Sequence, residues 1–337
     1  MRGLRRYYGK KILWYIATLF CALALNFFLP RLMPGDPIAA MVATAIGDGA
    51  ILGAEHIMYI ERQFIEQFGL DRPLPVQFFI YLGNIIRGDF GTSFLQAPRQ
   101  VADIIGESIM WTLALQIPAI IVGWILGNTL GAIAAYVRKG FDKGVLPMFI
   151  FISNIPAFGL AIVFLWIFAV NLQWFPLGGG FAFDMVPHRS MAFVMSVLRH
   201  YQLPFLTMVL IAMGGQAIGM RSMSIYELNA DYVKYARFLG IKNSKIIRYV
   251  FRNAMLPQIT GLAFALGAMV GGNIVAETIF NYPGIGTTIL SSIRGGDYPV
   301  ISAATLIITL MILVANLVIE IVYGLLDPRI KASQQDT

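Results

Sequence analysis

Long apolar stretches alternate with shorter polar ones along the chain. Because the hydrocarbon core of a bilayer is about 30 Å thick, a helix that crosses it needs about 20 mostly apolar residues. The six stretches of that length lie at about 12–30, 109–136, 147–171, 203–221, 257–279 and 302–325. The pattern therefore predicts an all-α polytopic membrane protein with six transmembrane helices.

The segment between the first two stretches has a helical pattern of its own. Within 55–70, apolar side chains recur at helical spacing and form one face: Ile57, Ile60, Phe64 and Phe68. Gly69 is a typical helix stop, and Pro73 and Pro75 in DRPLPVQ predict a rigid turn after it. We expect a small helical cap outside the membrane, between the first two transmembrane helices.

Two more loops connect stretches on the same side as that cap. The loop at 172–202 holds QWFPLGGGFAFD, in which Trp174 and Phe175 suit a membrane–water interface. The last loop holds NYPGIGTTILSSIRGGDYP, where Pro283 and Gly284 mark a turn. Because IGTTILSSI is too short to cross a membrane, we expect a re-entrant or interfacial piece there.

Prolines and glycines interrupt the apolar stretches. Pro118 and Pro156 should kink their helices or begin them. Ser153 and Asn154 precede the second break, where they either line a pathway or bond within the bundle. Glycines at four-residue spacing should let helices approach closely. These series are Gly123, Gly127 and Gly131, then Gly215 and Gly219, then Gly267 and Gly271.

Composition and charge support a membrane protein and give it an orientation. The chain is 58% hydrophobic and 13% charged, against about 25% charged residues in soluble domains. The net charge of +7 lies in short basic runs beside apolar stretches, which is typical of cytoplasmic loops and not of a nucleic-acid groove. These runs are the N-terminus, the link after the second stretch, the segment 222–256 and the tail. Six helices place them all on one side, so we expect both termini in the cytoplasm.

The first apolar stretch follows a basic N-terminus and could be mistaken for a secretory signal. It is long, and PRLMPGDP after it offers no small-residue cleavage site, so we expect a retained anchor. Cys21 lies within this stretch and, as the single cysteine, makes no internal disulfide. The three histidines lack ligand spacing, so the sequence predicts no metal site.

Familiar catalytic motifs are missing from the sequence. There is no G-x-x-x-x-G-K-[ST], no H-E-x-x-H and no G-x-S-x-G, so we predict no catalytic residue and no P-loop nucleotide site in this chain. Glu277 and Glu320 are the clear ionisable residues inside the predicted helices, near their ends. They either cap helices or are solvated at an interface, or they form a proton relay.

The most patterned polar segment runs from Asp231 to Pro257 as DYVKYARFLGIKNSKIIRYVFRNAMLP. One helical face is expected to hold Ile225, Leu228, Tyr232, Ala236 and Leu239. Gly240 should stop that helix, Ser244 should cap a second one, and Pro257 should begin the next span. The segment is either an amphipathic helix resting on anionic lipid or a docking element for a soluble partner.

This segment resembles the EAA-type loop of permease subunits of binding-protein-dependent ABC importers. The chain is similar to the peptide/nickel branch of that family, which includes oligopeptide and dipeptide permeases. The resemblance runs from about residue 10 to 331, through LMPGDP, FGLDRPLPVQ, NIIRGDFGTSF, LQWFPLGG, ETIFNYPGIGTTIL and GLLDPRI. The loop departs from the family pattern at Tyr235 and Arg237, where glutamate and alanine are common.

The resemblance implies an ABC type I importer-like fold and a set of partners. These are a second homologous permease subunit, two cytoplasmic ATPases that bind ATP and magnesium, and an extracytoplasmic solute-binding protein. The chain itself would hold no cofactor and would touch membrane lipid but no nucleic acid. The implied solute is an oligopeptide or dipeptide, an oligosaccharide or a nickel chelate, and the location is a bacterial or archaeal cytoplasmic membrane. The alternative function is a self-sufficient carrier or channel driven by an ion gradient.

The resemblance also suggests residue roles. Coupling to the ATPases falls on Asp231, Tyr232, Lys234, Tyr235, Ala236, Arg237 and Gly240. Pathway or gate candidates are Ser153, Asn154, Pro156, Glu277, Asn281, Pro283 and Gly284. Docking candidates for the binding protein are Asp71, Arg72, Trp174, Phe175 and Asp297. We divide the chain into 1–33 (N-terminus and first helix), 34–108 (outer cap), 109–331 (permease core, with coupling segment 222–256) and 332–337 (tail).

Overall fold

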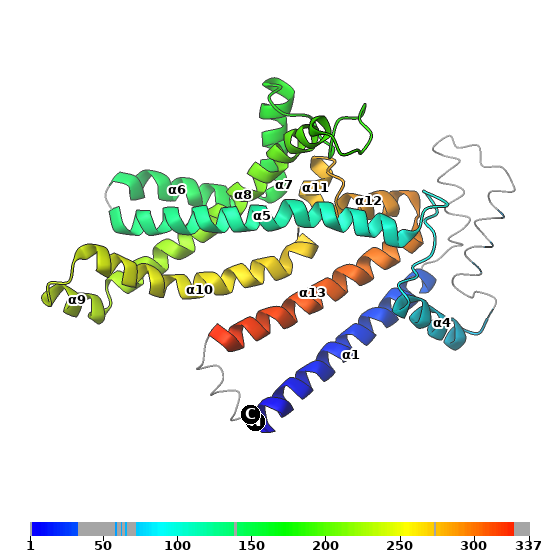
Figure 1. Cartoon of the computed structure of the whole chain (residues 1–337), viewed down its shortest axis with the longest axis horizontal. Helices are drawn as coiled ribbons and strands as arrows, with labels where there is room; N and C mark the ends of the chain where they lie inside the picture. Colours follow the sequence, from blue (N-terminus) through cyan, green and yellow to red (C-terminus); the bar gives the residue numbers. More distant parts are fainter. Residues whose placement is uncertain are drawn as a thin grey trace. The chain divides into compact units, whose positions relative to one another are not determined.

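The computed structural model describes residues 2–32, 58, 62, 65, 72–137, 140–272 and 274–326, and it is helical through most of them (Figure 1). The elements are α1 (Arg2–Leu32), α4 (Leu74–Ile86), α5 (Val101–Val137), α6 (Gly140–Asn154), α7 (Ala157–Phe164), the π-helix η1 (Leu165–Asn171), α8 (Met191–Leu228), α9 (Asp231–Phe238), α10 (Asn243–Gly272), α11 (Ile274–Ile279), α12 (Ile285–Gly295) and α13 (Tyr298–Leu326). Within the described residues, β-structure is limited to an isolated bridge between Thr92 and Gln100. The predicted all-α class is confirmed.

Among the described residues, three helices are each long and apolar enough to cross a membrane: α5, α8 and the part of α13 from Tyr298 to Leu317. A fourth candidate is a bent pair, Pro147–Asn154 with Ala157–Asn171, whose two parts differ in direction by 99°. The apolar stretch at 12–30 lies on α1, and the stretch at 257–279 lies on α10 and α11. The predicted apolar stretches are therefore helical in the part of the chain that the structure describes, apart from the break at 155–156 within the third.

Several of the predicted helix boundaries are wrong. α8 begins at Met191 and not near 203, because the Ser190 side chain caps it by accepting the Phe193 N–H at 3.2 Å. α4 begins at Leu74 inside the predicted DRPLPVQ turn, with a proline in its first turn, where a missing N–H costs nothing. α10 continues through Pro257 and does not begin there. Of the predicted cap at 55–70, nearly all lies outside the described residues.

The chain folds into two compact units, the first built from Met1–Thr112, Pro283–Leu317 and Gly324–Thr337. Its apolar core joins the start of α5 to α12 and α13. The core residues are Val101, Ile104, Ile105, Ile285, Ile289, Val300, Ala303 and Ala304. Asn26 fixes α1 to this unit, since its Nδ2 donates to the Ser302 carbonyl at 2.7 Å and to the Tyr81 hydroxyl at 3.1 Å. Such polar links between helices are typical of membrane bundles.

The second unit is built from Leu113–Tyr282 and Val318–Tyr323, and glycines set the spacing of its helices. A Cβ atom at Gly123 would lie 2.6 Å from Ala212 Cβ, and one at Gly127 would lie 2.6 Å from the Met213 carbonyl oxygen. A Cβ at Gly131 would overlap the Ala217 carbonyl. The predicted close approach along this series is therefore confirmed, and it joins α5 to α8.

The other two glycine series fare differently. Gly219 faces the Gln258 side chain of α10, 3.4 Å from a Cβ position, but Gly215 meets open space. The predicted close approach therefore holds at Gly219 and is wrong at Gly215. The third series ends at Gly271, outside the residues whose surroundings the structure describes.

Candidate functional site

The segment singled out by its pattern forms a helical hairpin from Asp231 to the first turns of α10 (Figure 1, at the end of α8). Gly240 closes α9 with a φ of +68°, as predicted. Its N–H donates to the Arg237 carbonyl at 3.0 Å, and the Ile241 N–H donates to the Ala236 carbonyl at 3.0 Å. This pair of bonds is a Schellman motif, which needs a left-handed residue at the glycine position.

The hairpin has its own small apolar core, which corrects two predictions. Val233, Ala236, Ile246 and Val250 are buried in it. Ala236, only 7% exposed, packs against α10, so the prediction that it contacts an ATPase is wrong. The single apolar face is also wrong, because the helix breaks at 229–230 and turns Leu239 out to 78% exposure.

The start of α10 differs from expectation as well. Ser244 is its second residue and not its cap, since α10 begins at Asn243. Asn243 also ties the hairpin to the neighbouring helix, because its Nδ2 donates to the Tyr136 hydroxyl of α5 at 3.0 Å.

Three large apolar side chains project from the hairpin, and we call them the hairpin tip: Tyr235, Phe238 and Leu239. They are 67%, 86% and 78% exposed. Charged neighbours surround them, and the Lys234 ammonium donates to Asp231 at 2.8 Å. That hydrogen bond lowers the pKa of Asp231, which therefore stays ionised. Clustered exposed apolar residues with a polar rim mark a surface that something else covers.

The piece between the last two spans is a helix, α12, held firmly within its unit. The Ile285 N–H donates to Thr112 Oγ1 of α5 at 2.9 Å, and Ser108 Oγ lies 2.6 Å from Thr288 Oγ1. Gly284 precedes it with φ −87° and ψ 176°, ordinary extended values. Residues other than glycine adopt such values, so the backbone does not require glycine at this position.

Asp297 is not available for docking. It is 1% exposed, and its carboxylate accepts hydrogen bonds from the Ser93 hydroxyl at 2.5 Å and from the backbone N–H groups of Phe94 and Leu95 at 3.2 and 3.3 Å. A buried carboxylate needs such donors. Asp297 therefore ties the loop before α5 to the α12–α13 junction, and the prediction that it contacts a binding protein is wrong.

The other docking candidates keep accessible surface where the structure describes them. Arg72 and Trp174 are exposed, while Phe175 is half-buried. The Trp174 and Phe175 rings both contact Phe168 of η1, with ring centres 5.8 and 6.4 Å apart from it. Asp71 lies outside the described residues.

The gate candidates of the bent pair bond locally. Ser153 Oγ and Asn154 Nδ2 both donate to the Ile150 carbonyl, at 3.0 and 2.7 Å, so they satisfy the end of α6. Pro156 then begins α7 as its N-cap residue, which confirms the predicted break. These bonds are local to α6, so the two alternatives, lining a pathway and bonding within the bundle, both stay open.

Glu277 and Asn281 share the short α11 segment and the turn after it. Glu277 is 1% exposed and accepts a hydrogen bond from Gln116 Nε2 of α5 at 3.3 Å, so solvation at an interface is wrong for it. Asn281 has a φ of 45°, a turn conformation that asparagine tolerates, and the Tyr282 N–H donates to the Glu277 carbonyl at 2.8 Å. The side chain of Glu320 lies outside the described part.

A polar stripe along α5 was missed at the level of sequence. Ser108, Thr112 and Gln116 recur every four residues and are all buried. That spacing places three polar side chains on one face of an apolar helix, and it was a readable signal for contacts with other helices.

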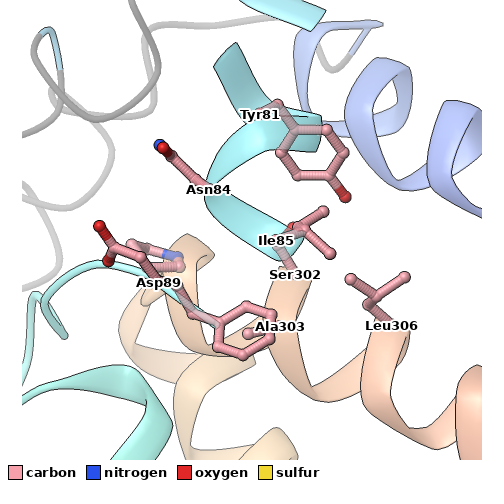
Figure 2. Close-up of a pocket in the computed structure, with 9 residues that line it drawn as sticks. Tyr81, Asn84, Ile85, Asp89, Ser302, Ala303 and Leu306 are labelled. Carbon is pink, nitrogen blue, oxygen red and sulfur yellow. The ribbon is translucent and has the colours of Figure 1, made fainter. Parts of the chain in front are cut away.

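One pocket lies between α4 and α13 within the first unit (Figure 2). Asn84 and Asp89 lie at its polar side, and Ala303 and Leu306 form its apolar wall. Its volume of about 30 Å³ holds a water molecule or two. It is too small for a transported solute.

Comparison with known proteins identifies the class of chain. Residues 127–332 match the family of binding-protein-dependent transport system inner membrane components. A Brucella ovis protein named as a peptide permease is 34% identical over 333 residues, covering 97% of this chain and 99% of that protein. The glutathione transport system permease protein GsiC of Escherichia coli K12 is 34% identical over 328 residues, covering 96% of this chain and 98% of that protein.

Proposed function

Because the chain belongs to the family of binding-protein-dependent transport system inner membrane components, we propose that it is a permease subunit of an ATP-driven importer. In this proposal it forms the solute pathway with a second permease subunit. Two cytoplasmic ATPases supply the energy, and a binding protein delivers the solute from outside. The chain has no P-loop motif of its own, which fits a division of labour in which partners hydrolyse ATP.

The observation that carries the proposal is the hairpin tip. A helix that rests on lipid lays its apolar face on the membrane. Here the apolar face of α9 is already packed on α10 through Val233 and Ala236. The residues left outside, Tyr235, Phe238 and Leu239, form a compact aromatic and aliphatic knob on a rigid hairpin. This is the form of an anchor that enters a groove in a protein, and we assign that groove to the ATPase.

The names of the relatives reduce the number of candidate solute classes. One is named for peptides and the other for glutathione, and both solutes are short chains of amino acids. We therefore propose a short peptide as the solute class. Within the chain, α12 and the α11 segment with Glu277 and Asn281 are the candidates for the outer gate.

Reconstitution tests the function directly. Vesicles that contain this chain, its permease partner, both ATPases and the binding protein should take up a labelled short peptide only when ATP is present inside. Omitting the ATPases should abolish uptake. Uptake by this chain alone, driven by a proton or sodium gradient, would instead establish the self-sufficient carrier.

Orientation is testable by cysteine labelling in a Cys21→Ser background. Asp184 and Asn243 are both exposed, and they lie near opposite ends of α8. The positive-inside rule places the Asn243 end in the cytoplasm. A cysteine at Asp184 should therefore react with an impermeant maleimide added to intact cells, and a cysteine at Asn243 should react only after the membrane is opened. The reverse pattern would overturn the assigned orientation.

A further inference from the structure

Glu227, in the last turn of α8, makes contacts with the two helices that follow it. Its Oε2 atom accepts a hydrogen bond from the Tyr232 hydroxyl of α9 at 2.7 Å. The same atom accepts a longer bond from Asn253 Nδ2 of α10 at 3.4 Å. One carboxylate oxygen therefore joins the end of a spanning helix to both arms of the hairpin.

The Tyr232 bond is the stronger of the two. Its donor–acceptor distance is short. A hydrogen bond to a charged acceptor is also about twice as strong as one between neutral groups. Burial, and then the hydrogen bond to Glu227, raises the pKa of Tyr232 to about 12. The hydroxyl consequently keeps its proton at any physiological pH and remains a donor.

The backbone between α8 and α9 offers little other restraint. Two residues, Asn229 and Ala230, separate the helices, and their N–H groups bond back into α8 at Ile225, Tyr226 and Glu227. Those bonds end α8 but leave the direction of α9 to side-chain contacts. The hairpin core joins α9 to α10, and Leu228 at the end of α8 packs against it. Glu227 adds a polar link from α8 to both following helices.

We propose that Glu227 is a positioning residue whose bonds to Tyr232 and Asn253 make the hairpin move as one piece with α8 and α10. A displacement imposed at the hairpin tip then reaches both spans and is not lost by bending at Asn229–Ala230. This inference rests on the proposed function, because it assigns Glu227 a part in coupling ATP hydrolysis to transport.

The test compares variants in the assembled transporter in vesicles. The quantities measured are the ATPase that copurifies with the chain and the ATP hydrolysed per solute taken up. Tyr232→Phe removes the hydroxyl and keeps the ring, and Glu227→Ala removes the acceptor. Each should leave copurification unchanged and raise the ATP-to-solute ratio by about tenfold or more, the range expected for one hydrogen bond to a charged group.

Three further variants separate coupling from simple stabilisation. The double variant Glu227→Ala/Tyr232→Phe should have no higher a ratio than Glu227→Ala alone, because Glu227→Ala already removes the bond to Tyr232. Glu227→Gln keeps an acceptor oxygen for Tyr232 and should stay within about twofold of the wild type. Tyr226→Phe removes an exposed hydroxyl from the same turn of α8 and should match the wild type.

Two results would overturn the inference. An unchanged ratio in both Tyr232→Phe and Glu227→Ala would show that the link does not transmit movement. A parallel fall in copurified ATPase and in uptake, at a constant ratio, would show that Glu227 only stabilises the fold. If the wild-type chain itself retains no ATPase, the proposed function fails and this inference fails with it, a result distinct from the other two.

Discussion

Phe238→Asp should cut the amount of ATPase that copurifies with this chain by about thirtyfold or more. Phe238 is the most exposed residue of the hairpin tip, at 86%, so the change leaves the hairpin core intact. Losing an aromatic anchor from an interface costs about 2–4 kcal/mol, and each 1.4 kcal/mol is a factor of ten in affinity. A new carboxylate placed in an apolar groove adds a desolvation cost. Affinity purification from membranes, followed by quantification of the bound ATPase, measures the effect.

Phe183→Asp is the matched control. Phe183 is 95% exposed in the loop before α8, whereas the hairpin follows the other end of that helix. The same chemical change there should leave ATPase association at the wild-type level. Normal ATPase association with Phe238→Asp, together with weaker binding of the isolated hairpin region to anionic vesicles, would favour the lipid-resting alternative instead.

Gly127→Ala should destabilise the second unit by about 2 kcal/mol or more. The added Cβ would lie 2.6 Å from a backbone oxygen of α8, and backbone cannot rotate away as a flexible side chain can. The two helices must then separate along the whole glycine series. The expected result is a lower melting temperature of the protein in detergent and a lower yield from membranes.

Gly215→Ala, on the neighbouring helix α8, should not lower the stability of this unit. Its Cβ would meet nothing within 4 Å, and alanine is a better helix former than glycine by about 1 kcal/mol. Stability should therefore be unchanged or slightly higher. If the two alanine variants melted at the same temperature, close packing of α5 on α8 would not be what holds this unit together.

The hairpin shows what pattern alone could predict and where it stopped. Gly240 could be predicted, because a glycine after an amphipathic run is a frequent helix stop. The pattern did not predict that Ala236 is buried and that Leu239 is exposed. Helical periodicity continues smoothly from Ile225 to Leu239, and Asn229 ends α8 with an ordinary right-handed conformation that leaves no glycine or proline as a signal.

The acidic residues show a second limit. Asp297 and Glu277 looked like surface or interfacial groups because each stands near the end of an apolar stretch. Their partners lie far away in sequence, Ser93 for one and Gln116 for the other. A single sequence does not tell which distant donors will meet a carboxylate. The polar stripe on α5 was available as a hint, since buried polar residues at helical spacing need partners on other helices.

The hairpin keeps the residues that fold it apart from those it displays. Val233, Ala236, Ile246 and Val250 form its core, and the Gly240 turn closes it without help from outside. Tyr235, Phe238 and Leu239 are largely in solvent and contribute little to that core. Substitutions at the hairpin tip should therefore change the folding stability of the hairpin very little. The hairpin can be retuned to a different partner surface by exchanging a few side chains while its backbone stays the same.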